Sequence, residues 1–146
     1  MAVTPTLSGA RTDRRPLPGL ATLTHISAGF LALTLVTDLA YMQTMVLMWQ
    51  DFSSWLLFFG LIVGGVAALL WILSAVMGRM RPVWGAALFS VLALVAGFVN
   101  SLIHAGDGWT AIVPWGLALS AVTCVLMLCA ALLSRAASRP RPFAVA

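Results

Sequence analysis

The sequence predicts an all-α integral membrane protein, a four-helix up-and-down bundle with its N- and C-termini in the cytoplasm. Of its 146 residues, 62% are hydrophobic and 8% are charged, whereas about a quarter of the residues of a soluble domain are charged. Four apolar runs of 22 to 24 residues interrupt the more polar remainder, and about 20 helical residues cross a hydrocarbon core. We therefore expect lipid, rather than water, to be the solvent around most of the chain.

The four runs define the expected segments. A tail rich in Thr, Pro and Arg, residues 1–19, has no apolar period, and we expect it to be disordered in the cytoplasm. Residues 20–133 form the transmembrane domain, and residues 134–146 form a basic cytoplasmic tail. The expected spans are approximately residues 20–43, 54–77, 83–104 and 111–133.

The outer end of the first span is open to two interpretations, because residues 44–49, TMVLMW, remain apolar. The span could be longer and tilted, or its end could lie flat at the membrane interface. We favour the shorter span, because residues 50–54, QDFSS, would then form a polar turn. Ser53 or Ser54 would cap the second span.

The orientation follows from the arginines. All eight lie in the two tails or in the loop between the second and third spans, and the opposite loops contain Asp51 and Asp107 but no arginine. The positive-inside rule therefore places both termini in the cytoplasm. The high isoelectric point arises from these same loop and tail arginines, so it does not indicate a nucleic-acid partner.

Polar residues within the spans give the main candidate site. Asp38 lies 18 residues after the start of the first span, and Asn100 lies 17 residues after the start of the third. Both spans start on the inside, so both side chains reach a depth of about 26 Å, just within the outer boundary. We expect an outward-side polar patch made of Asp38, Tyr41, Asn100, His104 and Asp107.

Asp38 has two interpretations. It could pin two helices through a hydrogen bond to Asn100 or Thr34, in its ionised or its protonated form. It could instead form a proton or cation site open to the outside, with His104 and Asp107 at its mouth, because an intramembrane acid is by default a candidate for function. His104 could also be a simple interfacial or capping residue.

We expect no enzymatic activity, and hence no catalytic residue, no metal site and no cofactor. The sequence contains none of the common metal, phosphate-loop or nucleophile motifs. Cys124 and Cys129 are five residues apart on one span, so they face different directions and serve as small hydrophobic residues. We do not expect a haem between the helices, because His25 and His104 lie near opposite faces of the membrane and could not share one iron.

Small residues indicate close helix packing. Gly60 and Gly64 form a GxxxG motif in the second span, and Gly116 with Ser120 forms a similar face in the fourth. With four spans available, we expect these faces to pack within one bundle.

Three stretches of the chain resemble a known family: VTDLAYMQT, FSSWLLFFGLIVGGVAALL and NSLIHAGDGWTAIVPWGLALSAV. In order and spacing they are similar to the bacterial four-span membrane proteins of the family of unknown function DUF2231, over roughly residues 25–133. The resemblance implies a four-helix protein of the bacterial inner membrane. Some members are joined to redox modules such as Rieske domains, which implies a respiratory neighbourhood.

Two functions remain open. The chain could be a non-enzymatic accessory or scaffold subunit of a larger membrane assembly, contacting other membrane subunits sideways through its lipid-facing helices. It could instead be a small redox or proton- or ion-coupled protein that uses the outward-side polar patch.

Overall fold

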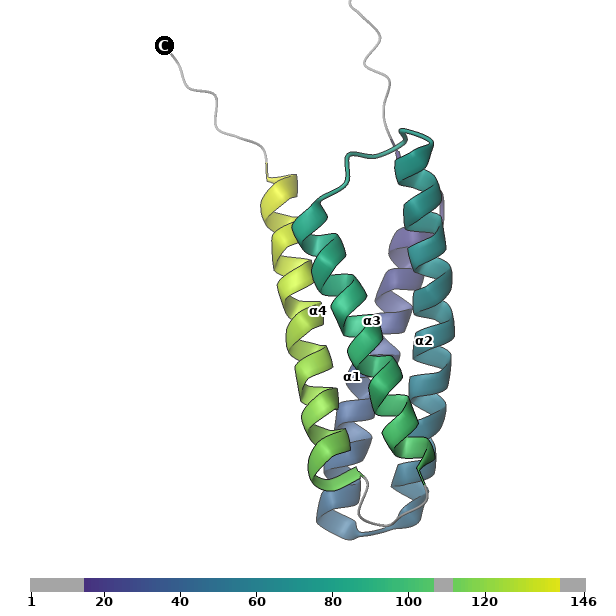
Figure 1. Ribbon diagram of the computed structural model, residues 1–146, viewed down its shortest axis with the longest axis vertical. Coiled ribbons are helices and arrows are strands. Elements are labelled where there is room, and N and C mark those ends of the chain that lie inside the picture. Colours follow the sequence, from purple (N-terminus) through teal and green to yellow (C-terminus); the bar gives the residue numbers. More distant parts are fainter. Residues whose placement is uncertain (1–14, 107–111, 140–146) are drawn as a thin grey trace, which may run out of the picture.

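The computed structural model describes residues 15–106 and 112–139, and in these residues every regular element is a helix (Figure 1). A short kinked segment, η1 (Ile112–Gly116), in which Val113 is extended and is followed by a cis peptide bond to Pro114, leads directly into the last helix. Four helices are long and apolar enough to cross a membrane. The all-α, four-span fold predicted from the sequence is confirmed. The four helices are α1 (Leu20–Thr44), α2 (Leu47–Val76), α3 (Trp84–Ala105) and α4 (Leu117–Ser138).

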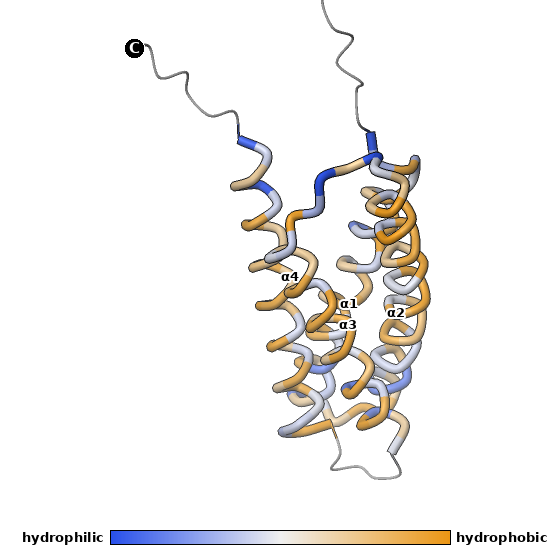
Figure 2. The backbone as a smooth tube through the Cα atoms, turned by 45° about the horizontal axis from the view of Figure 1, so that its top comes forward, coloured by the Kyte–Doolittle hydropathy of each residue, from blue (hydrophilic) through white to orange (hydrophobic). Residues whose placement is uncertain are grey.

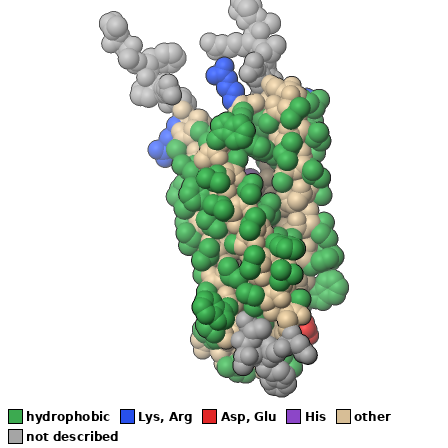
Figure 3. All heavy atoms as spheres, viewed as in Figure 1, with side chains coloured by type: hydrophobic (Ala, Val, Ile, Leu, Met, Phe, Trp, Pro, Cys, Tyr) green, Lys and Arg blue, Asp and Glu red, His purple; other side chains and the backbone are tan. Residues whose placement is uncertain are grey.

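The helices run alternately up and down. α1 packs mainly against α2, and α3 mainly against α4, so that two helical hairpins lie side by side (Figure 1). The start of α1, the α2–α3 connection and the end of α4 share one end of the bundle, which we call the arginine end. Arginine side chains project there, and hydrophobic side chains cover the visible face below them (Figure 3). The described arginines are Arg15, Arg79, Arg81, Arg135 and Arg139.

The turn between α1 and α2 differs from the expected one. The chain reverses at Met45, which has a left-handed φ of 53° and donates its N–H to the Tyr41 carbonyl, and at Val46, which is extended. α2 then begins at Leu47, so the expected polar turn at residues 50–54 is wrong. The apolar residues on both sides of this short turn continue into helices, because helical hydrogen bonds satisfy their backbone in lipid. Ser53 is consequently an interior residue of α2.

The interior of the bundle is more polar than its lipid-facing surface. Large hydrophobic side chains such as Trp55, Leu69 and Trp84 are 60% or more exposed, and hydrophilic residues gather near the two ends of the bundle (Figure 2). Lipid replaces water as the outer solvent, so apolar side chains need not be buried and the polar ones are turned inward. The described buried residues that are polar or charged are Ser27, Thr34, Thr37, Asp38, Ser53, Ser74, Asn100, His104, Ser120 and Thr123.

Gly60 and Gly64 lie where α2 meets its neighbours. A Cβ atom on Gly64 would lie 2.7 Å from Ser27 Oγ of α1 and 2.6 Å from Leu94 Cδ2 of α3. The close approach lets Ser27 Oγ donate a 2.7 Å hydrogen bond to the Gly60 carbonyl. The absence of side chains at these two positions therefore allows α1 to hydrogen-bond directly to the backbone of α2.

Substitution of Gly64 tests this packing. Gly64→Ala should lower the free energy of unfolding by about 1–3 kcal/mol, because the added methyl group overpacks a fixed contact. Gly65→Ala is the matched control, since nothing lies within 4 Å of its Cβ position, and it should not destabilise the protein. Unfolding in mixed detergent micelles measures both variants, and equal stability of the two would contradict the packing.

Candidate functional site

Asp38 is the centre of a buried hydrogen-bond network that joins all four helices. Its side chain lies on α1 with no exposed surface. Ser53 of α2 donates to Oδ1 at 2.6 Å, and Ser120 of α4 donates to Oδ2 at 2.5 Å. His104 of α3 brings Nε2 to 2.9 Å from Oδ1. Each of the other three helices thus contributes one partner to this carboxyl group.

The hydrogen bonds of His104 fix the number of protons that it shares with Asp38. His104 Nδ1 lies 3.0 Å from the Asn100 backbone carbonyl, which can only accept, so Nδ1 carries a hydrogen. One further proton must lie between Nε2 and Asp38 Oδ1, because two lone pairs would repel each other there. Whether this proton lies on nitrogen or on oxygen, the pair has no net charge.

The helix ends around the pair favour the ionised arrangement. His104 lies in the last turn of α3, where the unpaired carbonyl groups of a helix favour a positive charge. Ser120, which donates to the carboxyl group, is the fourth residue of α4, where the positive end of a helix favours a negative charge. A carboxylate beside α4 and an imidazolium at the end of α3 therefore match the helix dipoles.

Two hydrogen-bonded side chains extend the network. Thr37 Oγ1 lies 2.6 Å from Ser53 Oγ, and Asn100 Nδ2 donates to Ser120 Oγ at 2.7 Å. Asn100 Oδ1 is buried and has no hydrogen-bond partner among the described residues. We call the complete set the polar cluster; it consists of Thr37, Asp38, Ser53, Asn100, His104 and Ser120.

Gly116 leaves room beside the polar cluster at the start of α4. A Cβ atom at this position would lie 3.0 Å from His104 Cε1 and 3.5 Å from Asn100 Oδ1. Any larger residue would therefore press on the imidazole ring and close the space next to the unpartnered amide oxygen. The expected small-residue face of Gly116 and Ser120 thus lies against the polar cluster rather than against a purely apolar surface.

The structure brings together three of the five residues of the expected patch. Asp38 and His104 are in direct contact, and Asn100 reaches Asp38 through Ser120. Tyr41 is buried on α1, one turn beyond Asp38. Asp107 lies outside the described residues.

The hydrogen-bond partners of Asp38 differ from those expected from the sequence. Asp38 bonds to neither Asn100 nor Thr34; the hydroxyl group of Thr34 donates to the Phe30 carbonyl of its own helix. Ser53 was missed as a partner because it was assigned to a turn. An earlier start of α2, which the apolar residues 44–49 allow, would have placed Ser53 on a helix at the depth of Asp38.

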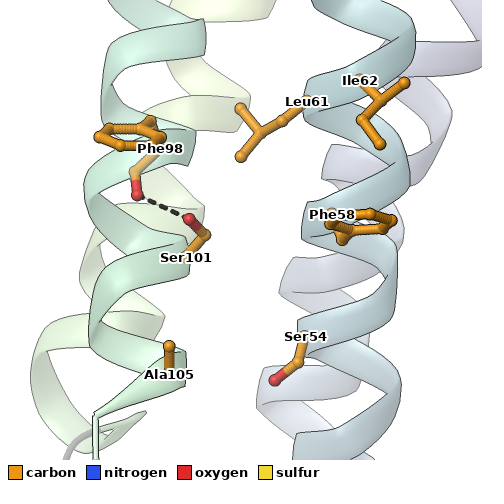
Figure 4. Close-up of a pocket in the computed structure, with 7 residues that line it drawn as sticks. All are labelled: Ser54, Phe58, Leu61, Ile62, Phe98, Ser101 and Ala105. Carbon is orange, nitrogen blue, oxygen red and sulfur yellow. Dashed lines mark hydrogen bonds between the residues drawn. The ribbon is translucent and has the colours of Figure 1, made fainter.

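A groove of about 400 Å³ lies between α2 and α3 (Figure 4). Its two hydroxyl groups are satisfied by their own helices: Ser54 Oγ donates to the Gln50 carbonyl, and Ser101 Oγ donates to the Phe98 carbonyl. The groove is therefore an apolar, lipid-facing surface without a reactive group. Its lining residues are Ser54, Phe58, Leu61, Ile62, Phe98, Ser101 and Ala105.

The other residues that could ligate a metal lie apart from the polar cluster. Within residues 15–106 and 112–139, no three His, Cys, Asp or Glu side chains form a group that could hold a metal ion. His25 is exposed in the first part of α1, and Cys124 and Cys129 are free thiols on α4. Both ring nitrogens of His104 already form hydrogen bonds, so coordination of a metal by His104 would break one of them.

Comparison with known proteins identifies the family of the chain. Residues 21–137 match the family described as predicted membrane protein (DUF2231). The chain belongs to this family. No curated protein and no solved structure matches the chain significantly. All six residues of the polar cluster lie within the part of this DUF2231 protein that matches.

Loss of Ser120 should weaken the DUF2231 bundle. Ser120→Ala removes a donor to Asp38 and the acceptor of Asn100, and the buried polar groups left behind cost about 1–3 kcal/mol of unfolding free energy. Ser90→Ala is the control, because Ser90 is exposed and donates only to the Ala86 carbonyl of its own helix. Unfolding in mixed micelles should separate the two variants. Equal stability would mean that the bonds of Ser120 contribute nothing to the fold.

Proposed function

We propose that this protein is a multi-pass protein of the bacterial inner membrane with its arginine end in the cytoplasm. The five described arginines gather at one end of the bundle, and Asp51 is exposed towards the other, which supports this orientation through the positive-inside rule. A cysteine in place of Arg79, in a chain whose own two cysteines are replaced, should resist a membrane-impermeant thiol reagent in intact cells. Labelling of this cysteine in intact cells would show that the arginine end faces the outside, opposite to the proposed orientation.

Within this setting, we propose that the protein binds a proton at Asp38 and His104 and responds to the pH outside the cell. The observation that supports this most strongly is the 2.9 Å contact between Asp38 Oδ1 and His104 Nε2, fully enclosed within a membrane-spanning bundle. An aspartate costs about 3 kcal/mol to insert at the centre of a span, and the cost is smaller towards the end of a span, where Asp38 lies on α1. Neutral groups suffice to hold helices together, as the bond from Ser27 to the Gly60 carbonyl demonstrates. An ionisable pair adds the ability to bind or release a proton.

The position of the pair supports proton sensing rather than proton conduction. Towards the arginine end, the described interior contains apolar residues such as Leu31, Leu57 and Ala67. The hydroxyl groups of Ser27 and Thr123 are engaged with backbone carbonyls. Hydrogen bonding therefore does not continue from the polar cluster towards the arginine end through the described part of the bundle, which argues against a proton path across the membrane.

A second candidate function is that of an accessory or scaffold subunit in a larger membrane assembly. The groove between α2 and α3 supports it, because Phe58, Ile62 and Phe98 form an open apolar recess that a helix of another subunit could fill. Isolation in mild detergent tests this candidate: a stoichiometric membrane protein that is lost from Phe98→Ala would support it. Recovery of the chain alone from its native membrane would argue against it.

Proton uptake tests the sensing proposal. Protein in lipid vesicles, with the end opposite to the arginine end exposed, should take up more protons on acidification than Asp38→Asn does, because the pair has a site for one more proton. Asp38→Asn, which removes the carboxyl group, should abolish this additional uptake, whereas His25→Gln, which changes the exposed histidine, should retain it. The vesicles should also hold an imposed pH gradient as long as empty vesicles do.

Two results would contradict the proposal. One is equal proton uptake by the wild type and Asp38→Asn. The other is rapid collapse of the gradient, which would indicate conduction rather than sensing.

A further inference from the structure

The hydrogen bonds from Asn100 to Asp38 form a chain with a direction. Asn100 Nδ2 donates to Ser120 Oγ, and Ser120 Oγ donates to Asp38 Oδ2. Every bond in this chain points towards the carboxyl group, as an ionised Asp38 requires. A proton added to the carboxyl group would oppose this direction.

The two oxygens of Asp38 are not equivalent. Oδ1 already faces two groups, Ser53 Oγ and His104 Nε2, whereas Oδ2 faces only Ser120 Oγ. A proton that enters the pair therefore has its free place on Oδ2. Once there, it must be donated to Ser120 Oγ, whose own hydrogen then has to turn towards Asn100.

We propose that Asn100 is a two-position amide switch that turns over when Asp38 Oδ2 binds a proton. In the present position the amide offers Nδ2, a donor, to Ser120. The reversed hydroxyl group of Ser120 needs an acceptor, and the amide supplies one by exchanging the places of Nδ2 and Oδ1. The chain then runs from Asp38 to Ser120 to Asn100, with one proton gained from solvent. No covalent bond changes apart from the new O–H bond on Asp38.

The surroundings of Asn100 Oδ1, the amide atom that does not face Ser120, permit Oδ1 and Nδ2 to exchange places. Asn100 Oδ1 is buried without a partner in residues 15–106 and 112–139, so turning the amide over replaces one unpartnered atom by another and breaks no bond within this part of the chain. Because residue 116 is glycine, the space beside Oδ1 stays open; a Cβ atom would lie only 3.5 Å away. The bond to Ser120 alone therefore decides which way the amide lies.

Few other groups near the polar cluster can take up the proton. The residues facing Asp38 are Ser53 from α2, His104 from α3 and Ser120 from α4. On its own helix, Tyr41 lies one turn further along, and the nearest carboxyl group along α2, Asp51, is exposed. Among the described residues, His104 is thus the one ionisable group in contact with Asp38, and it shares the proton already counted between them.

The switch rests on the proposed proton binding and adds a readout for it. Protonation of Asp38 on α1 changes the hydrogen bond between Asn100 of α3 and Ser120 of α4. Asn100 acts as a positioning residue in this scheme, because it touches Ser120 and not the proton site itself. Its role therefore has to be measured separately from proton uptake.

Asn100 is the only asparagine of the chain, so labelling of asparagine with ¹⁵N reports on this amide alone. In lipid bilayers, we expect the side-chain amide signal of Asn100 to shift with pH at the same midpoint as the carboxyl signal of Asp38, followed with ¹³C-labelled aspartate. In Ser120→Ala the midpoint of the carboxyl signal should move, because Oδ2 loses its partner, while the amide signal should no longer change with pH. In Ser90→Ala both signals should behave as in the wild type.

The outcomes distinguish the switch from the proton site. An amide signal that does not change while Asp38 titrates would overturn the switch and leave proton binding intact. An amide shift that persists in Ser120→Ala would overturn the route through Ser120. If the Asp38 carboxyl signal does not titrate over the pH range in which the protein stays folded, the proposed function itself fails.

Discussion

The site of this protein depends on one constraint: a carboxyl group within the hydrocarbon depth of a membrane needs hydrogen-bond donors. Water cannot solvate Asp38 there, so each donor has to come from the protein. α1 provides the acid, and α2, α3 and α4 provide Ser53, His104 and Ser120. The short turn after α1 and the glycine at the start of α4 follow from the same need, because they bring these three side chains within hydrogen-bond distance.

The fold could be predicted from the sequence almost completely, because the length and hydropathy of a membrane span are set by the bilayer. The meeting of Asp38 with Asn100 and His104 could be predicted in part, since residue counting gives the depth of a side chain but not its direction around the helix. Ser53 could not be found in this way. Its role depended on the start of α2, and the apolar residues before it allow that helix to begin anywhere over about two turns. From the sequence, Ser120 is predicted to be a small packing residue. Its small size suits helix packing and its hydroxyl group suits hydrogen bonding, so the sequence does not distinguish the two roles.

The interior of the bundle near the arginine end differs from the interior at the opposite end. Near the arginine end, Gly60 and Gly64 allow contact between backbones, and hydroxyl groups bond to carbonyls; this part has no ionisable partner among its described buried residues. At the other end, the polar cluster combines a carboxyl group, an imidazole and an amide with one unpartnered atom. A fully satisfied neutral network would rigidify the bundle, whereas this one retains a place for a further proton and an amide that can follow it. That difference is the basis of the proposal that this protein senses protons.

The coupling free energy between Asp38 and His104 tests the account most directly. It is obtained from the unfolding free energies of the wild type, Asp38→Asn, His104→Gln and the double variant in mixed micelles. Each single change leaves a buried partner uncompensated, so the account predicts that the double variant is more stable than the sum of the single losses implies, by about 1 kcal/mol or more. Single losses that add to within about 0.5 kcal/mol would show that the two side chains act independently, and would contradict a shared proton at the centre of this bundle.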